Sequence, residues 1–314
     1  MLKLVALGGG HGLAATLTSL RSVTEDITAI VTVADDGGSS GRLRRDFGVI
    51  PPGDLRMALA ALCADDEWGN AWAQAIQYRF PGDEGVGGHA LGNLMLTALW
   101  NSTGDVVLSL EQMGNLLKVK GRVLPMAAVP LTISATVNLD SSSKAPAGRV
   151  EGQVAVATTS HEIVDVELLP HNPPATLEAI TAISNADWIT LGPGSWYSSV
   201  IPHLLVPDQL SALVESKARK VLIMNLDAGN QDADSGEAAG LTATRHFEIL
   251  LEHAPGLHFD CVIVDPSSTA NPESLRARMA KMGCELVLED VSAGNLHHDP
   301  AKLAGVLKKI FLEK

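Results

Sequence analysis

The sequence has few cysteines and no long apolar run. Cys63, Cys261 and Cys284 are scattered over 314 residues, and no two have the CxxC spacing of a zinc site. An odd number of isolated thiols does not indicate a disulfide framework and is typical of a reducing compartment. No apolar run approaches the ~20 residues that span a bilayer, and the chain starts in a strand pattern rather than a signal segment. We therefore expect a soluble, cytoplasmic protein without membrane insertion.

An excess of positive charge is also missing. The formal net charge is −13, which argues against nucleic acid or an anionic membrane as the main partner. A small anionic ligand remains compatible with this charge, because a local group of backbone N–H donors dominates at short range.

Several well-known catalytic patterns do not occur. The chain has no HExxH, no P-loop lysine motif and no GxGxxG, and the loop Gly192–Ser195 at the end of a predicted strand reads GPGS rather than GxSxG, with no partner carboxylate placed. Their absence argues against a zinc protease, a P-loop NTPase and a nucleophile-elbow hydrolase. An NAD(P)-dependent oxidoreductase is disfavoured for the same reason, although glycine loops accept any pyrophosphate.

A glycine cluster near the N-terminus is the first positive signal. Leu2–Leu7 has the composition of a buried strand, Gly8–Gly12 reads GGGHG, and leucines at helical spacing follow. A strand, a glycine loop and a helix in this order form an anion site, because the helix start offers unpaired N–H groups. The alternative is a plain tight turn in which the histidine acts as a cap. The candidate ligand residues here are Gly9, Gly10, His11 and Gly12.

Acidic residues follow the second predicted strand, Ile27–Val33. Asp35 and Asp36 lie where parallel-sheet ligands bind, and a carboxylate there can hold ribose hydroxyls or a divalent metal such as Mg²⁺. The alternative is an Asx turn, which Asp-Gly sequences favour. Adjacent carboxylates in a turn usually point apart, so we expect only one of them to meet a ligand.

Further polar residues lie in glycine-rich or helix-start positions. Gly37–Gly41 is expected to be a Gly/Ser loop, and Asp54 is expected to cap a helix over 54–63. Arginines beside a phosphate loop can bind phosphate in a bidentate manner. His89 and Asn93, four residues apart, can face one side of a helix, and His89 could act as a general base. The remaining candidates are Ser39, Ser40, Arg42, Asp54, Arg56, His89, Asn93, Gly192, Pro193, Gly194, Ser195 and Asn225.

Strand and helix patterns alternate along most of the chain. This alternation predicts an α/β fold with a Rossmann-like, mostly parallel sheet and helices on both faces. Residues 122–169 instead alternate Thr, Val and Ser between turn clusters, which predicts a small antiparallel β excursion. We expect one domain over 1–314 that contains this excursion.

The motifs together resemble one family over nearly the whole chain. The stretches LGGGHGL, TAIVTVADDGGSSGRLR, IPPGDLR, GHALGN, GRVLPM and LGPGSWYSSVIPHLLVP resemble the YvcK family, the so-called gluconeogenesis factors, in an actinobacterial version. This family is part of a CofD-like (UPF0052) superfamily. The resemblance implies a Rossmann-like core with one nucleotide site between the glycine loops.

The resemblance also implies a function. Similar proteins bind nucleotide sugars such as UDP-N-acetylglucosamine and are linked to cell shape, cell-wall homeostasis and gluconeogenic growth, with no reaction assigned. The alternative is an enzyme like the 2-phospho-L-lactate transferase of deazaflavin cofactor synthesis, which uses Mg²⁺. One departure is Asn230–Gly240, where Ala238 replaces the family threonine, and 228–240 is expected to be mobile. Apolar helices beside the excursion suggest a homodimer.

Overall fold

A seven-stranded parallel sheet forms the centre of the molecule. The computed structural model describes residues 1–139, 148–226, 241–294 and 296–313. The strand order is β10-β9-β8-β7-β1-β2-β3, and every neighbouring pair is parallel. Most of these strands are short apolar runs with little exposure, as is usual when helices cover both faces of a sheet. Their bounds are β1 Leu4–Gly8, β2 Ile27–Val31, β3 Arg122–Pro125, β7 Trp188–Leu191, β8 Arg219–Ile223, β9 Cys261–Val264 and β10 Glu285–Leu288.

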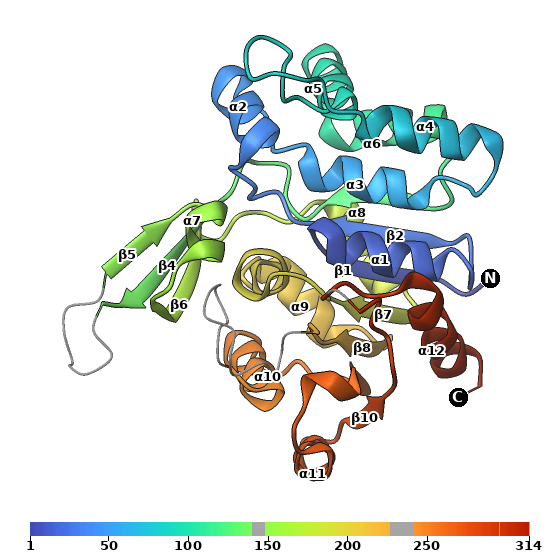
Figure 1. The fold of residues 1–314 in the computed structure, drawn as a ribbon, viewed down its shortest axis with the longest axis vertical. Helices are drawn as coiled ribbons and strands as arrows, with labels where there is room; N and C mark the ends of the chain where they lie inside the picture. Colours follow the sequence, from blue (N-terminus) through green and yellow to red (C-terminus); the bar gives the residue numbers. More distant parts are fainter. Residues whose placement is uncertain (140–147, 227–240, 295, 314) are drawn as a thin grey trace.

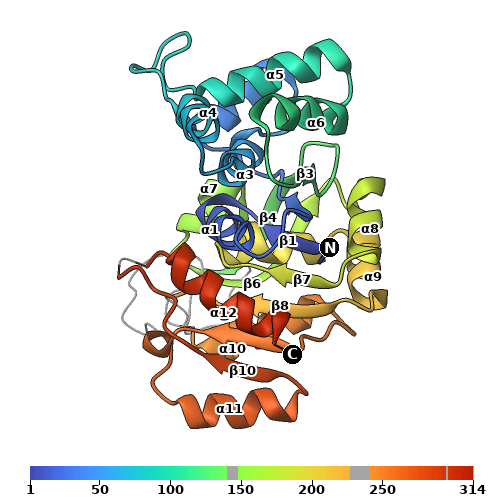
Figure 2. The ribbon, with the colours of Figure 1, turned by 90° about the vertical axis from the view of Figure 1, so that its right-hand side faces the viewer.

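Helices cover the two faces of this sheet. Helices α1 and α12 lie on one face of the central strands, whereas α8 and α9 lie on the other (Figures 1 and 2). This arrangement confirms the predicted α/β fold class. The helix bounds are α1 Gly10–Leu20, α2 Gly38–Phe47, α3 Gly53–Leu62, α4 Glu67–Gln77, α5 Leu91–Thr103, α6 Val106–Leu117, α8 Leu177–Ser184, η1 Trp196–Val200, η2 Ile201–Leu204, α9 Pro207–Glu215, α10 Ala243–His253, η3 Pro266–Ser268, α11 Pro272–Lys281 and α12 Pro300–Leu312.

The direction of winding reverses beside β1. From β1 the chain winds through β2 to β3 on one side, and from β7 it winds through β8 and β9 to β10 on the other. Leu7 and Leu191 are register partners, and the Gly192 N–H donates to the carbonyl of Leu7 at 3.1 Å. The loops that follow these two strands therefore start side by side. In open α/β sheets such a switch point is where ligands bind.

A small antiparallel sheet projects from the main body (Figure 1). It has the order β5-β4-β6, with β4 at Thr132–Asn138, β5 at Gly148–Glu151 and β6 at Glu162–Leu169, and the short helix α7 spans Gln153–Thr158. The predicted β excursion over 122–169 needs one correction. Residues 122–125 form β3 and pair with β2 in the main sheet, so the antiparallel part begins at 132.

Three local expectations were wrong or incomplete. The expected Gly37–Gly41 loop is mostly the first turn of α2, which begins at Gly38 with a positive φ of 44°. Asp54 does not cap α3, because that helix begins at Gly53 and the Asp54 carboxylate faces Thr32. The helical turns of η1 and η2 over 196–204 were not predicted. The unusual loop at 228–240 lies outside the described residues.

None of the helices in the described ranges is long and apolar enough to cross a bilayer.

Candidate functional site

A cavity of about 780 Å³ opens at the carboxyl ends of β1, β7 and β8. A first glycine loop, Gly8–Gly12, and a second, Gly192–Ser195, contribute to its lining, and segments from α1, α3, α4, α7 and the β10–α12 loop complete its walls. The predicted residues that line it are Gly9, Gly10, His11, Gly12, Pro193, Gly194, Ser195 and Asn225. Gly192 lies at the start of the second loop. The structure thus brings two predicted loops, far apart in the sequence, into one cavity.

The two loops touch each other through Gly12. A Cβ at this position would lie 2.6 Å from the carbonyl carbon of Pro193 and 2.9 Å from the Cα of Gly194. The Thr16 hydroxyl donates to the carbonyl of Gly192 at 3.3 Å, which fastens α1 to the second loop. Because α1 and the 192–195 loop approach this closely, only glycine fits at position 12.

Unpaired backbone donors face the cavity at the start of α1. Within the described chain, the N–H groups of Gly9, His11 and Gly12 donate no hydrogen bond, as is normal for a first helical turn. The second loop differs, because the Asn225 side chain accepts from Gly194 N at 2.9 Å and donates to Gly194 O at 2.8 Å. Asn225 lines the cavity but holds this loop in place. The N–H of Gly194 is therefore occupied, whereas those of Gly9, His11 and Gly12 are open to a ligand.

Asp54 lies behind the first glycine loop. Its carboxylate accepts from the Thr32 hydroxyl at 3.2 Å, and a Cβ added at Gly9 would lie 2.6 Å from its Oδ2. Burial raises the pKa of Asp54 to about 6, the nearby Asp35 carboxylate adds to the shift, and the Thr32 hydroxyl opposes it. Two carboxylates that repel each other beside an anion site suit Mg²⁺, which takes one or two carboxylates together with ligand phosphates.

The predicted metal candidates, Asp35 and Asp36, are held in different directions. Asp35 accepts from the N–H of Gly37 at 2.9 Å in an Asx turn, and its charge acts on Asp54. Asp36 accepts from the N–H of Val154 at 3.0 Å and so fastens α7 to the main body. Of the two, Asp35 together with Asp54 fits a metal, while Asp36 has a structural contact. The described residues contain no cluster of three or more His, Cys, Asp or Glu side chains suited to a metal.

Replacing Asp54 with asparagine should change how stability depends on pH. Because the carboxyl pKa is about 6 in the folded state and ~3.9 in the unfolded chain, the folded state binds this proton more tightly. Its contribution to stability is therefore greatest below pH ~4 and falls as the pH rises through ~6. In urea unfolding, the free energy of unfolding of Asp54→Asn minus that of the wild type should be larger at pH 7.5 than at pH 4.5. An identical difference at both pH values contradicts the raised pKa.

Ser39, His89 and Asn93 form a buried cluster beside α2. The Ser39 hydroxyl lies 2.9 Å from His89 Nδ1 and accepts from Asn93 Nδ2 at 2.9 Å. Since the amide occupies one lone pair of the hydroxyl, the serine proton is free to bond His89, and burial lowers the pKa of His89. Asn93 Oδ1 is buried and has no partner in the described structure. These three predicted residues meet one another but do not line the cavity.

The other predicted residues have separate positions. Arg56 is 6% exposed, its Nε has no partner among the described residues, and burial lowers its pKa. Arg42 bonds the carbonyls of Asp83 and Gly87, so it braces the 80–88 loop. Ser40 accepts from Gly53 N at 3.1 Å and joins α2 to α3. None of these three side chains lines the cavity.

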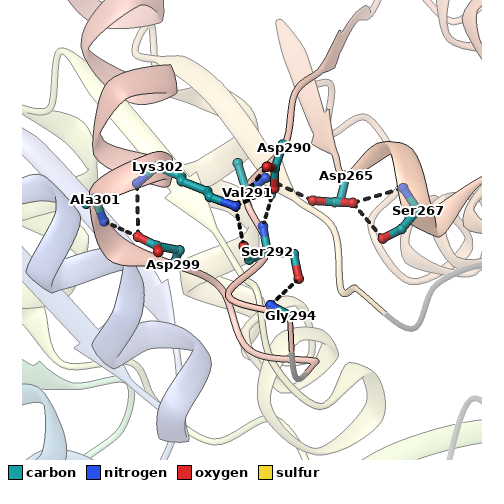
Figure 3. Close-up of polar contacts among 9 residues, drawn as sticks. All are labelled: Asp265, Ser267, Asp290, Val291, Ser292, Gly294, Asp299, Ala301 and Lys302. Carbon is teal, nitrogen blue, oxygen red and sulfur yellow. Dashed lines mark hydrogen bonds and ion pairs between the residues drawn. The ribbon is translucent and has the colours of Figure 1, made fainter.

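The loop between β10 and α12 contributes a wall of the cavity that was not predicted from the sequence. Leu296, His297 and His298 line the cavity, and the rings of His297 and His11 lie 6.1 Å apart. Figure 3 shows how polar contacts hold this loop, with Asp265 accepting from the N–H of Val291 at 2.9 Å. Two histidines in a polar stretch after a predicted strand were the available signal.

A second part of the cavity wall that was not predicted from the sequence is an apolar shelf on α1, α3 and α4. It consists of small or flexible side chains with two polar groups, Thr18 and Gln77, beside them. Single alanines on helix faces carry no functional signal in a sequence. The shelf residues are Ala14, Ala15, Met57, Ala60, Ala61 and Ala73.

Comparison with known proteins places this chain in a family. Residues 4–302 match the family described as 2-phospho-L-lactate transferase CofD. A Mycobacterium tuberculosis protein, named provisionally as a gluconeogenesis factor, is 48% identical over 97% of this chain and 89% of its own length. The gluconeogenesis factor of Bacillus subtilis is 34% identical over 99% of this chain and 98% of its own length.

Solved structures agree with these relatives. Two crystal structures of a Bacillus halodurans protein, one described as a member of the UPF0052 family, superpose with TM-scores of 0.78 and 0.81 at 30% and 31% identity. Each comparison covers 98% of this chain, and 98% and 99% of the respective structures. The predicted resemblance is confirmed over almost the full length, and the chain belongs to the CofD family.

Proposed function

We propose that this protein binds a nucleotide sugar through its diphosphate and serves gluconeogenic growth, cell shape and cell-wall homeostasis. The observation that carries the proposal is the cavity at the switch point of the sheet, with the unpaired N–H groups of Gly9, His11 and Gly12 at its floor. A helix start with free donors favours phosphate oxygens. The cellular role follows the names of the relatives and the family resemblance.

The cavity has room for more than a diphosphate. Its volume of about 780 Å³ lies in the range typical of sites for drug-sized ligands. Beside the polar floor, the apolar shelf of α1, α3 and α4 offers a surface for a base or sugar, with Thr18 and Gln77 as hydrogen-bonding groups. We assign UDP-N-acetylglucosamine as the representative ligand on the strength of the family resemblance.

A thermal-shift series tests this proposal. UDP-N-acetylglucosamine, UDP, UMP and uridine are compared with the matching adenosine compounds. At 100 times its Kd a ligand stabilises the folded protein by ~2.7 kcal/mol, so a clear rise in Tm is expected for the uridine diphosphates and little for uridine. No shift with any uridine diphosphate at millimolar concentration contradicts the proposal.

A Mg²⁺-dependent transferase of the CofD type is the second candidate. The proximity of Asp35 and Asp54, which raises the pKa of Asp54, favours it, since a cation would relieve their repulsion. On this alternative the two carboxylates would hold Mg²⁺, which would supply positive charge to the phosphate groups of the ligand. A phospholactyl transfer assay with Mg²⁺ should then detect product, and Asp35→Asn should abolish it while Asp36→Asn retains it. Absence of transfer by the wild type argues against the alternative.

A further inference from the structure

The cavity has an unusual charge property for a phosphate site. Among the described residues that line it there is no lysine, arginine, aspartate or glutamate. The sequence of 227–240, which follows the cavity residue Leu226, contains no Lys, Arg or His either. A bound diphosphate carries negative charge that neutral N–H groups balance only in part. The histidines are the groups in the lining that can become cationic near neutral pH.

Two of these histidines lie next to each other in the cavity lining. His11 is the second residue of α1, and His297 belongs to the loop between β10 and α12. Their ring centroids are 6.1 Å apart with an interplanar angle of 45°. Both residues are exposed, and their ring nitrogens make no hydrogen bond within the described chain. His298 differs, because its Nε2 donates to the carbonyl of Met224 at 3.1 Å.

We propose that His11 and His297 bind the diphosphate of the ligand as an imidazolium pair, so that binding takes up protons. This inference rests on the proposed function and names the charge that completes its site. A bound diphosphate places negative charge beside the two rings, which favours their cationic forms. Proton binding and ligand binding therefore support each other.

The other charged groups around the pair are already engaged. On α3, Asp54 lies behind the glycine loop and Arg56 is buried outside the cavity lining. At the far end of α1, Arg21 pairs with Asp65 at 3.0 Å. These groups leave the two imidazoles as the titratable pair in the cavity lining. Asp54, whose pKa burial raises to about 6, also gains a proton near pH 6, so the histidine variants must separate its effect from that of the pair.

The loop that carries His297 and helix α12 balance their own charges. Lys302 pairs with Asp290 at 2.7 Å and also donates to the carbonyl of Ser292 (Figure 3). Asp299 accepts from the N–H groups of Ala301 and Lys302 at 2.8 and 3.1 Å. Lys302 is therefore held by this network rather than directed at the cavity. The same contacts fix the path of the loop that brings His297 next to His11.

Calorimetric titration of the full chain with UDP-N-acetylglucosamine at pH 8 and pH 6 tests the pair. This probe is a diphosphate diester, so its own charge does not change in this interval. Uptake of one proton raises affinity by up to tenfold per pH unit between the free and bound pKa values, so we expect about tenfold tighter binding at pH 6. Titrations in buffers of different ionisation enthalpy should show protons taken up.

Variants separate the pair from other sources of pH dependence. His11→Gln and His297→Gln should each weaken binding at pH 6 and reduce the pH dependence. His171→Gln is the matched control, because that side chain is 66% exposed and lies outside the cavity lining. Equal affinity at both pH values, or an unchanged pH dependence in both cavity variants, overturns the inference.

ADP-ribose, another diphosphate diester, distinguishes this inference from the proposed function. If it binds with the expected pH dependence and UDP-N-acetylglucosamine does not, the histidine pair stands and the uridine assignment falls. If neither diester binds at pH 6, the pair is overturned together with the diphosphate site.

Discussion

Gly12→Ala should abolish most ligand binding. The added Cβ clashes with the backbone of Pro193 and Gly194, which cannot swing away as a flexible side chain could. Either α1 or the 192–195 loop must move, and the N–H groups of the first turn lose their alignment with the phosphate. We expect UDP-N-acetylglucosamine to bind about 100-fold more weakly, which corresponds to ~2.7 kcal/mol. Overpacking should also lower the free energy of unfolding by ~1–3 kcal/mol.

Gly48→Ala provides the matched control. Gly48 ends α2 with a φ of +64° and has no neighbour within 4 Å of an added Cβ. Its substitution costs ~1 kcal/mol through backbone strain alone and leaves the cavity intact. Calorimetry and urea unfolding of both variants separate lost stability from lost binding. Wild-type affinity in Gly12→Ala would refute the idea that the contact between the loops shapes the site.

His203→Leu should cause a large loss of stability. The side chain is fully buried in η2, its Nε2 donates to the carbonyl of Gly8 at 3.1 Å, and the Gln209 amide donates to its Nδ1 at 3.0 Å. Leucine is of similar size but leaves one hydrogen of the Gln209 amide unpaired, at a cost of ~1–3 kcal/mol. It also removes one of the two hydrogen bonds that the Gly8 carbonyl accepts, the other coming from the Thr32 N–H at 3.0 Å. We expect a total loss of ~2–4 kcal/mol in urea unfolding at pH 7, and weaker ligand binding because Gly8 begins the first loop.

The same variant should respond differently to acid. Burial lowers the pKa of His203 to about 4, whereas the unfolded chain protonates its histidine near ~6.5. The wild type therefore loses stability from this group as the pH falls from ~6.5 toward ~4, and the deficit of His203→Leu should shrink over that interval. Asp54 acts in the opposite direction, so each variant must be compared with the wild type at each pH. A deficit below 0.5 kcal/mol at pH 7 contradicts the assigned hydrogen bonds.

The local parts of the site were predictable from sequence. The order of strand, glycine loop and helix over residues 4–20 is set by neighbouring residues, so the first loop was placed correctly. The pairing of β1 with β7 was not predictable, because it joins residues about 180 positions apart through a strand order that local patterns do not encode. His297 was missed for a related reason, since only the fold of the 290–299 loop brings it next to His11.

Other residues were predicted as ligands because their types suit ligands. Asp36, Arg42 and Asn225 have polar groups that bond the backbone of α7, the 80–88 loop and Gly194. A sequence shows that such a residue lies near a glycine loop. It does not show whether the protein's own backbone already occupies the side chain. Direct contact of these residues with a ligand stays a prediction.

A crystal structure of the protein with UDP-N-acetylglucosamine would show directly where the diphosphate binds. The diphosphate is predicted to lie between the 9–12 and 193–195 loops, within hydrogen-bond distance of the N–H groups of His11 and Gly12 and beside His297. A diphosphate bound outside this cavity, for example at Ser39 and His89 alone, would contradict this prediction.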